Sequence, residues 1–274
     1  MSTNPTRINT GRNLPVATAV GLLFGGLLVG SLYFDRWLFV ALMSVTGILA
    51  LTELVKILTL HGVKISLLHV QISTPILLAV SYYSGLEAVA IAFVIITIMG
   101  WIYRLRDGIE NFVQDAAAIS FVLFYVPLLL AFMVDLASAD NGFQRVIAVA
   151  LLTSANDTGG YFAGILAGRH PISKISPKKT WEGFAGSIVL AGLVGTFGSA
   201  ALLDIPQWQG ALVALAVVLT ATAGDLIESA MKRDLGIKDM GTSVPGHGGM
   251  LDRIDSFLIT APIAWCAFVW ILGV

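Results

Sequence analysis

Long apolar segments are the feature that most limits what this chain can fold into. Hydrophobic residues make up 57% of its 274 residues and charged residues only 12%, about half of the roughly 25% that is usual in soluble domains. The mean hydropathy is +0.86. Because a soluble domain of this length could not bury so much apolar surface, we expect the lipid bilayer to be its solvent.

Nine segments have nearly the length that a membrane-crossing helix needs, about 20 residues. The sequence therefore predicts an all-α, polytopic integral membrane protein with about nine transmembrane helices, folded as a single transmembrane domain over residues 1–274. The length of the first segment favours a retained span over a cleaved signal peptide. The segments cover residues 14–34, 37–55, 66–83, 86–103, 116–136, 146–168, 184–203, 208–230 and 256–273.

The distribution of Lys and Arg tests this count independently. Of the 16 basic residues, all but Arg36 and Arg145 fall in the N-terminal stretch or in every second connection. Under the positive-inside rule, this bias places the N-terminus in the cytoplasm and the C-terminus outside. The net charge of −1 and the lack of a basic run give no indication of nucleic-acid binding.

Two of the predicted cytoplasmic connections are longer and more polar than the others. They read GRHPISKISPKKTWEG, residues 168–183, and KRDLGIKDMGTSVPGHGGMLDRIDS, residues 232–256. Anchoring of the topology by positive charge explains some of the lysines. It does not explain the acidic residues, glycines and hydroxyl groups that accompany them.

Carboxylates gather at the ends of the helices that border these connections. Asp225 and Glu228 are spaced i,i+3 near the end of the eighth segment, and Asp252 and Asp255 repeat that spacing at the start of the ninth, so each pair shares one helix face. Acidic groups at membrane depth are costly and usually mark an ion, proton or substrate site. For any single one, a salt bridge to a nearby Lys or Arg is an equally good explanation.

The residue types in this region suit a phosphate site assisted by a metal ion. Clustered carboxylates without clustered Cys or His are hard oxygen ligands, which favours Mg²⁺ or Mn²⁺ over zinc. The lysines and arginines are typical phosphate partners, and Gly246, Gly248 and Gly249 allow backbone N–H groups to approach an anion. Ser176 and Thr180 add hydroxyl donors. No P-loop or Rossmann glycine motif is present in the sequence.

The run from Ser229 to Asp255, SAMKRDLGIKDMGTSVPGHGGMLDRID, resembles the C-terminal motif of the phosphatidate cytidylyltransferases, the CDP-diacylglycerol synthases. SPKKTWEG, 176–183, and ANDTGGYFAG, 155–164, are also similar to segments of that family. Val244 departs from the pattern, because the family more often has Leu or Ile there. The matching elements are Ser229, Lys232-Arg233, Lys238-Asp239, Gly241, Pro245, His247-Gly248-Gly249 and Asp252-Arg253-Ile254-Asp255.

The resemblance implies an activity in phospholipid biosynthesis: CTP and phosphatidic acid give CDP-diacylglycerol and pyrophosphate. It implies a multi-pass protein of the inner (plasma) membrane with its active site facing the cytoplasm, and a division into a motif-poor N-terminal half, about 1–145, and a catalytic C-terminal half, about 146–274. It further implies Mg²⁺ dependence, with K⁺ as a candidate second metal.

The resemblance also assigns expected roles to residues, by their positions in the motifs. The expected metal ligands are Asp225, Asp252 and Asp255. The expected catalytic residues are Asp225, Asp252, Lys232, Arg233, Lys238, Asp239, His247 and Arg253. The expected substrate-binding residues are Asn156, Asp157, Ser176, Lys178, Lys179, Thr180, Ser229, Gly248 and Gly249.

Two alternatives stay open on the sequence. A transporter would use acidic groups near the bilayer midplane and often has two related halves, whereas here the polar residues gather at the cytoplasmic helix ends. A CTP-dependent polyprenol kinase or a CDP-archaeol-type synthase would share the scaffold, but the Ser229–Asp255 motif favours the diacylglycerol enzyme. The spacing of Gly21/Gly25 and Gly26/Gly30 allows a homodimer.

Overall fold

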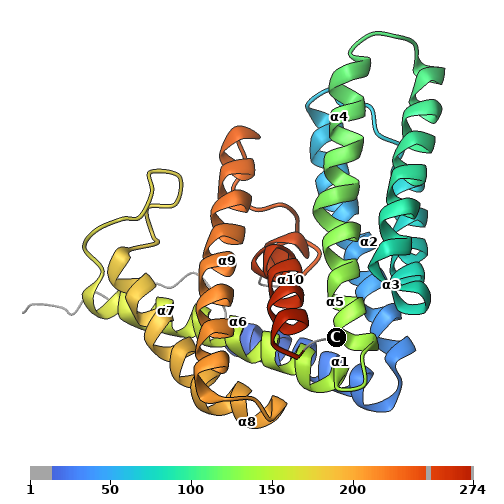
Figure 1. Cartoon of the computed structure of the whole chain (residues 1–274). Coiled ribbons are helices and arrows are strands. Elements are labelled where there is room, and N and C mark those ends of the chain that lie inside the picture. The colour runs from blue at the N-terminus through green and yellow to red at the C-terminus, as the bar shows by residue number, and fades with distance from the viewer. Residues whose placement is uncertain (1–13, 245–247, 273–274) are drawn as a thin grey trace, which may run out of the picture.

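Helices make up most of the chain in the computed structural model, which describes residues 14–244 and 248–272 (Figure 1). Within these residues no β-strand forms, and only two isolated bridges occur, Pro171 with Thr180 and Val244 with Gly248. In chain order the elements are α1 (Leu14–Phe34), α2 (Arg36–Leu60), α3 (Leu67–Arg104), η1 (Leu105–Asp107), α4 (Phe112–Leu123), η2 (Phe124–Leu128), α5 (Leu129–Ser138), α6 (Gly142–Ala167), α7 (Trp181–Leu193), η3 (Val194–Ser199), α8 (Ala200–Leu203), α9 (Gln207–Asp234) and α10 (Leu251–Leu272).

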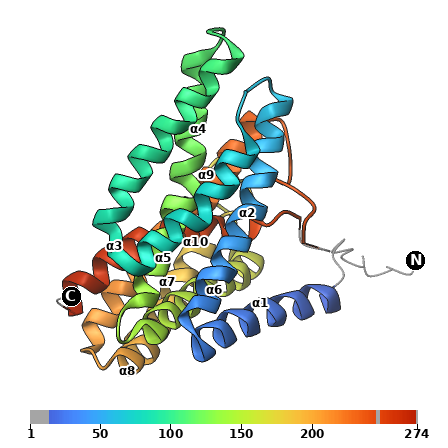
Figure 2. The same cartoon turned by 90° about the vertical axis from the view of Figure 1, so that its right-hand side faces the viewer.

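The element α3 consists of two helices that fold back on each other at Gly85. This glycine has φ 71° and ψ −179°, a conformation that side-chain-bearing residues avoid. His69 Nε2 lies 3.1 Å from the Ile96 carbonyl oxygen, although 27 residues of straight helix would span about 40 Å. The two halves of α3 are therefore antiparallel neighbours, as Figure 2 shows.

Six helical runs among the described residues are long and apolar enough to cross a membrane, which indicates a multi-pass membrane protein. Each of the nine predicted segments overlaps one helical run when α3 is divided at Gly85. The polar side chains of Asn156 and Asp157 help to keep α6 outside the six, and α3 together with η1 forms one run of 41 residues among them. The all-α prediction is confirmed, whereas nine crossings, the orientation of the termini and the single domain stay predictions.

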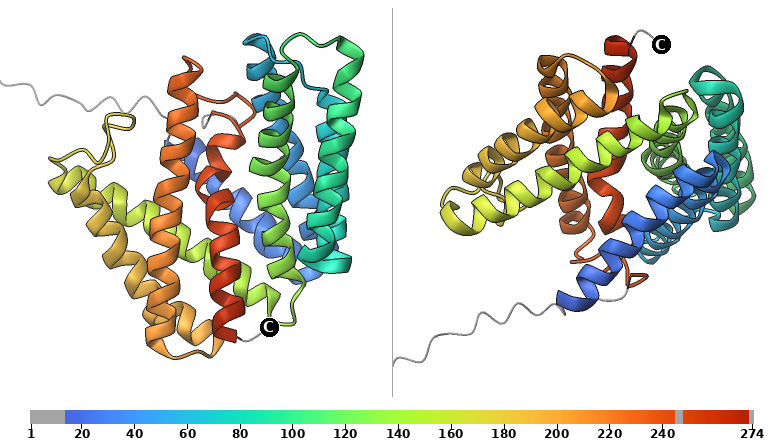
Figure 3. Two further views of the ribbon diagram at one scale, coloured as in Figure 1. Left: turned by 45° about the horizontal axis from the view of Figure 1, so that its top comes forward. Right: turned by 90° about the horizontal axis from the view of Figure 1, so that it is seen from below.

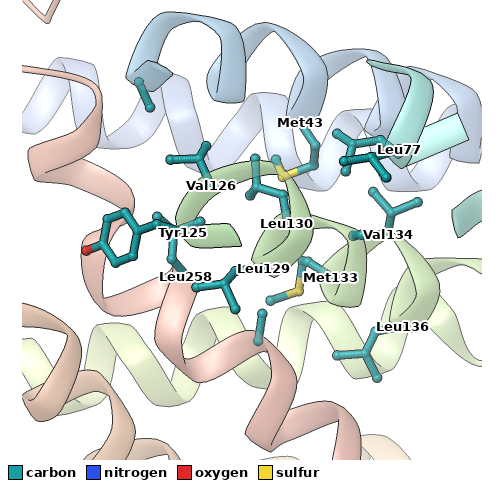
Figure 4. Close-up of a cluster of buried hydrophobic side chains, with 14 of the residues drawn as sticks. Met43, Leu77, Tyr125, Val126, Leu129, Leu130, Met133, Val134, Leu136 and Leu258 are labelled. Carbon is teal, nitrogen blue, oxygen red and sulfur yellow. The ribbon is translucent and has the colours of Figure 1, made fainter. Parts of the chain in front are cut away.

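Apolar side chains divide between a packed interior and an outer surface. Figure 4 shows part of the interior, where Leu130 and Val134 of α5 lie beside Met43 of α2 and Leu77 of α3. On the outside, Ile91 and Ile102 of α3 are 65% and 60% exposed. Apolar side chains on both surfaces of a helix are typical of a helix in contact with lipid.

The C-terminal elements form a group in which α6 packs against both α7 and α9, and α9 packs against α10. Figure 3 shows α6 running obliquely across α9 and α10. In Figure 1 the α6–α7 connection and the C-terminal end of α9 lie in the upper part of the molecule, whereas the C-terminal end of α10 lies in the lower part. This arrangement places the two polar connections on one side of the helices.

The reversal of the chain direction at Gly85 predicts that substitution of this glycine lowers the stability of the protein. We expect Gly85→Ala to lower the stability of the detergent-solubilised protein by about 1–3 kcal/mol, because alanine cannot adopt this backbone conformation without strain. Gly192→Ala in α7 is the matched control, since a Cβ there meets nothing within 4 Å and alanine is the better helix former. Thermal unfolding of both variants checks this, and equal melting temperatures would contradict it.

Candidate active site

The two long polar connections join helices of one packed group. Residues 168–180 lead from α6 to α7, and residues 235–250 lead from α9 to α10. Both connections lie on one side of the molecule, next to the C-terminal end of α9 (Figure 3, left). Polar side chains from these helix ends are therefore close enough to form one site, and their contacts establish that they do.

A lysine on α9 holds two buried carboxylates together. Asp225, Glu228 and Lys232 lie on one face of α9 because they are spaced i, i+3 and i+7. Lys232 Nζ donates to Glu228 Oε2 and, at 2.9 Å, to Asp252 Oδ1 of α10. The side chains of Lys232, Glu228 and Asp252 are 17%, 3% and 4% exposed. One ammonium group thus contacts two acids and joins α9 to the first turn of α10.

The second oxygen of Asp252 organises the backbone before α10. Asp252 Oδ2 accepts hydrogen bonds from the N–H groups of Met240 and Gly249, at 2.9 Å and 2.8 Å. A carboxylate is favoured at the start of a helix, where N–H groups have no partner within the helix. Asp252 therefore has a structural role in addition to any role toward a ligand.

Close packing of α9 on α10 brings a third acid to the site. A Cβ at Gly224 would lie only 2.7 Å from the carbonyl oxygen of Asp255, so only glycine permits this approach. The Asp255 side chain is buried, and its Oδ1 accepts a hydrogen bond from Ser256 N at 2.8 Å. Across from it, Glu228 Oε1 is buried and has no hydrogen-bond partner within the described residues.

The sixth helix contributes the amide and carboxylate of Asn156 and Asp157. Asn156 Nδ2 donates to Asp157 Oδ1 at 3.0 Å, and the Asn156 carbonyl oxygen accepts from Ser187 Oγ of α7 at 2.6 Å. Asn156 is buried, and its Oδ1 lacks a hydrogen-bond partner in the part of the chain that is described. This pair therefore presents both a carboxylate and a free amide oxygen to the site.

Lys179 is brought to the site by the α6–α7 connection. Hydrogen bonds from Ile172 N to the Lys179 carbonyl oxygen at 2.8 Å and from Trp181 N to the His170 carbonyl oxygen at 2.9 Å close this connection into a loop. The Lys179 ammonium forms an ion pair with Asp225 of α9. Burial lowers the pKa of Lys179, and the neighbouring carboxylates, Asp157 first, oppose that shift.

Two cavities meet at Asp157. The first has a volume of about 210 Å³ and is lined by polar groups from α6, the α6–α7 connection, α7 and α9, including Lys178, Lys179, Thr180 and Asp225. The second has a volume of about 530 Å³ and is lined mainly by apolar side chains of α1, α2, α6 and α10, together with Arg253. Because Asp157 lines both, a polar and an apolar compartment adjoin at one carboxylate.

The structure brings many of the predicted site residues together. Asn156, Asp157, Lys178, Lys179, Thr180 and Asp225 line one cavity. Lys232 of α9 contacts Asp252 of α10 and shares a face of α9 with Asp225. Asp255 and Gly249 lie beside this group through the α9–α10 contact and the Asp252 hydrogen bond. Their roles toward substrates stay predictions.

Other predicted residues lie at the edge of this group. Arg233, Lys238 and Asp239 are exposed, and Arg233 Nε donates to the Ile175 carbonyl oxygen at 3.5 Å. Thr180 Oγ1 accepts from Gly183 N at 3.1 Å and so caps α7. Ser229 lies on α9, Ser176 accepts from Lys179 N through its carbonyl oxygen, and Gly248 has φ +86° in the turn before α10. His247 lies outside the described residues.

The motifs did not indicate two residues that the structure connects to the site. Tyr125, in η2, points from the N-terminal half toward α10 (Figure 4), and its buried hydroxyl has no hydrogen-bond partner among the described residues. Glu53 of α2 contacts the backbone at the start of α10. The sequence signal for Glu53 was a single acidic residue inside an apolar segment, and such a residue is expected to have a function in a membrane helix.

The donor atoms at this site fit a hard divalent cation. Asp157, Asp225, Glu228, Asp252 and Asp255 offer only oxygen, and Glu228 Oε1 is a buried acceptor without a partner in the described ranges. Mg²⁺ prefers such ligands. No group of three or more acidic, His or Cys side chains within residues 14–244 and 248–272 is arranged to hold a metal ion. Lys179 and Lys232 contact three of these acids, Asp225, Glu228 and Asp252.

Together these features define a class of protein: a helical, multi-pass membrane protein with a polar cavity at one end of its helices and an apolar cavity beside it. The particular family follows from comparison with known proteins. A model of the cytidylyltransferase family matches residues 15–271, so this chain belongs to the cytidylyltransferase family, whose members are nucleotidyltransferases.

Individual relatives match along nearly the whole chain. A phosphatidate cytidylyltransferase of Mycobacterium leprae is 38% identical over 272 residues, which cover 93% of this chain and 87% of the relative. A protein of the same name from Mycobacterium bovis is 37% identical over 270 residues, covering 93% and 88%. Another from Bacillus subtilis is 33% identical over 234 residues, covering 83% and 87%.

The bridge made by Lys232 predicts a coupled effect on stability. We expect Lys232→Met to destabilise the protein by on the order of 3–5 kcal/mol, because it leaves two buried carboxylates without their shared cation. The double variant Glu228→Gln/Lys232→Met removes one of those charges and should recover part of the loss. Thermal unfolding of the purified single and double variants measures this. A double variant no more stable than Lys232→Met would show that the two groups are not coupled.

Proposed function

We propose that this chain transfers the cytidylyl group of CTP to phosphatidic acid, giving CDP-diacylglycerol and pyrophosphate. The observation that carries the proposal is the junction of the two cavities at Asp157 in a chain that belongs to the cytidylyltransferase family. An enzyme that transfers a group from a nucleotide to a lipid requires a polar, cationic compartment for the nucleotide beside an apolar one for the lipid. The names of the relatives support phosphatidate as the acceptor.

The proposed reaction requires no general base on the protein. An oxygen of the lipid phosphate is already ionised near neutral pH and attacks the α-phosphorus of CTP. A new P–O bond forms there, the bond from the α-phosphorus to the bridging oxygen of the β-phosphate breaks, and pyrophosphate leaves with the electron pair. Catalysis then consists of bringing two anions together and stabilising the charge of the transition state.

The lysines around the polar cavity are suited to the nucleotide. Lys178 and Lys179 line this cavity, and Lys232 lies on the adjacent α9 face. We propose that these three side chains neutralise the triphosphate and the departing pyrophosphate. Arg233, Lys238 and His247 stay proposed members of the same group.

Arg253 is better placed for the lipid than for the nucleotide. Arg253, an expected catalytic residue, lines the apolar cavity, whereas Lys178 and Lys179 line the polar cavity. We propose that its guanidinium binds the phosphate of phosphatidic acid, since arginine recognises phosphate in a bidentate manner. The apolar side chains of α1, α2 and α6 would then contact the acyl chains.

Asp225, Asp252 and Asp255 are the proposed ligands of Mg²⁺. When bound, the cation would neutralise the phosphates of CTP and polarise the reacting phosphorus centre. The carboxylates of Asp225 and Asp252 are held in place by Lys179 and Lys232, so these lysines orient the acids as well as balance their charge. A second metal, K⁺, and a homodimer belong to the proposal as well, as do the inner membrane and a site that faces the cytoplasm.

The products distinguish the proposed reaction from its nearest alternative. With CTP, phosphatidic acid and Mg²⁺, we expect the purified protein to form CDP-diacylglycerol and one pyrophosphate per turnover. A CTP-dependent lipid kinase would instead release CDP. Thin-layer chromatography of labelled lipid and an enzymatic pyrophosphate assay measure both products. Failure to release pyrophosphate with phosphatidic acid would contradict the proposal.

Removal of one proposed metal ligand tests the role of the carboxylates. We expect Asp225→Asn to lower kcat by about a hundredfold or more and to raise the Mg²⁺ concentration needed for half-maximal activity. The matched control is Asp204→Asn, because Asp204 is exposed, lies at the end of α8 and has φ +55°, which asparagine also tolerates. Magnesium titrations of initial rates compare the two. Wild-type Mg²⁺ dependence in Asp225→Asn would exclude this residue as a ligand.

A further inference from the structure

A glutamate of the motif-poor half contacts the backbone that carries the proposed metal ligands. Glu53 lies in α2, in an otherwise apolar stretch, and is 6% exposed. Its Oε1 accepts a hydrogen bond from Met250 N at 2.9 Å, and its Oε2 accepts one from Leu251 N at 3.0 Å. The two oxygens of one carboxylate therefore bind adjacent peptide groups, at the point where α10 begins.

The start of a helix is where such a carboxylate has its strongest effect. The first N–H groups of a helix have no partner within the helix, and the helix dipole favours a negative charge there. In a buried position, an N–H group without a partner is costly. Glu53 satisfies two of these groups, and Asp252 satisfies Gly249 N and Met240 N. Both carboxylates thus define the path of the chain into α10.

Two glycines of the segment before α10 lie close to the Glu53 carboxylate. A Cβ at Gly241 would lie 2.4 Å from Glu53 Oε1, and a Cβ at Gly249 would lie 2.5 Å from Glu53 Oε2. The segment before α10 therefore closes on the Glu53 carboxylate from two sides. A change in the position of this carboxylate is transmitted to Gly249, and through Gly249 N to the Oδ2 atom of Asp252.

We infer that Glu53 is a positioning residue for the reaction: it holds the N-terminus of α10 so that Asp252 and Asp255 face α9. This inference rests on the proposed function, because it assigns those two aspartates to the metal. It also gives the N-terminal half a specific task. Glu53 is 197 and 198 residues away from its two partners in the sequence. A distant helix therefore sets the geometry of the motif.

The conservative variant Glu53→Gln separates positioning from folding. Glutamine has nearly the same shape but one acceptor oxygen, so it can bind only one of the two N–H groups. We expect kcat to fall by about ten- to a hundredfold, as small misplacements of catalytic groups do, and the Mg²⁺ concentration for half-maximal activity to rise. The KM for phosphatidic acid should rise as well, because Glu53 binds Met250 N, and both Met250 and Arg253 line the apolar cavity.

Glu87→Gln is the matched control, because Glu87 is an exposed glutamate of α3 in the same half. Hydrogen exchange provides a readout besides activity: amides of residues 248–252 should exchange faster in Glu53→Gln than in wild type or Glu87→Gln. Exchange and kcat at wild-type values in Glu53→Gln would overturn the inference. A lower melting temperature would also overturn it if the folded fraction of Glu53→Gln kept the wild-type kcat and the wild-type Mg²⁺ dependence. Glu53 would then have a structural role only.

The proposed function and the positioning role fail in different ways. If the wild-type protein forms no CDP-diacylglycerol, the proposed function is wrong, and hydrogen exchange alone decides whether Glu53 holds the start of α10. If the wild type is active and Glu53→Gln resembles Glu87→Gln in every assay, the function stands and the inference is wrong.

Discussion

Neutralisation of charge in apolar surroundings is the constraint on which this structure depends. The buried acids of α9 and α10 are stable only because each has a cation or a backbone N–H group within reach. Lys232 forms ion pairs with both Glu228 and Asp252. Lys179, in the α6–α7 connection, forms an ion pair with Asp225. The pairs therefore fix how α9, α10 and the α6–α7 connection sit against one another.

Buried charges in the N-terminal half are also paired, and there the pair stabilises the connection between two helices. Arg104 and Asp115 form a buried pair at 2.5 Å, and Arg104 also donates to the carbonyl oxygens of Gly108 and Glu110, which closes the connection between α3 and α4. Arg104 thus has a structural role besides its contribution to the positive-inside pattern. Glu53 extends this half to the start of α10, so the half without motifs is physically continuous with the site.

Features that depend on residues close together in the chain could be predicted from the sequence. The nine apolar segments overlap the helical runs, and the i,i+3 spacing of Asp225 with Glu228 places both on one face of α9. The pairing of Lys179 with Asp225 could not be predicted, because 46 residues separate them and no local rule selects one lysine among several. Thr180 caps α7 and also lines the polar cavity, so its predicted substrate contact stays a prediction.

The sequence by itself determined the class of protein. Its hydropathy requires helices in a membrane, and its motif of acids, lysines and glycines indicates the family. Only the tertiary structure decided which groups meet: Asp157 at the junction of two cavities, Lys232 between two acids, and Glu53 at the start of α10. The physical reason is that helix formation depends on neighbours within a few residues, whereas charge pairing and cavity shape depend on packing between segments far apart in the chain.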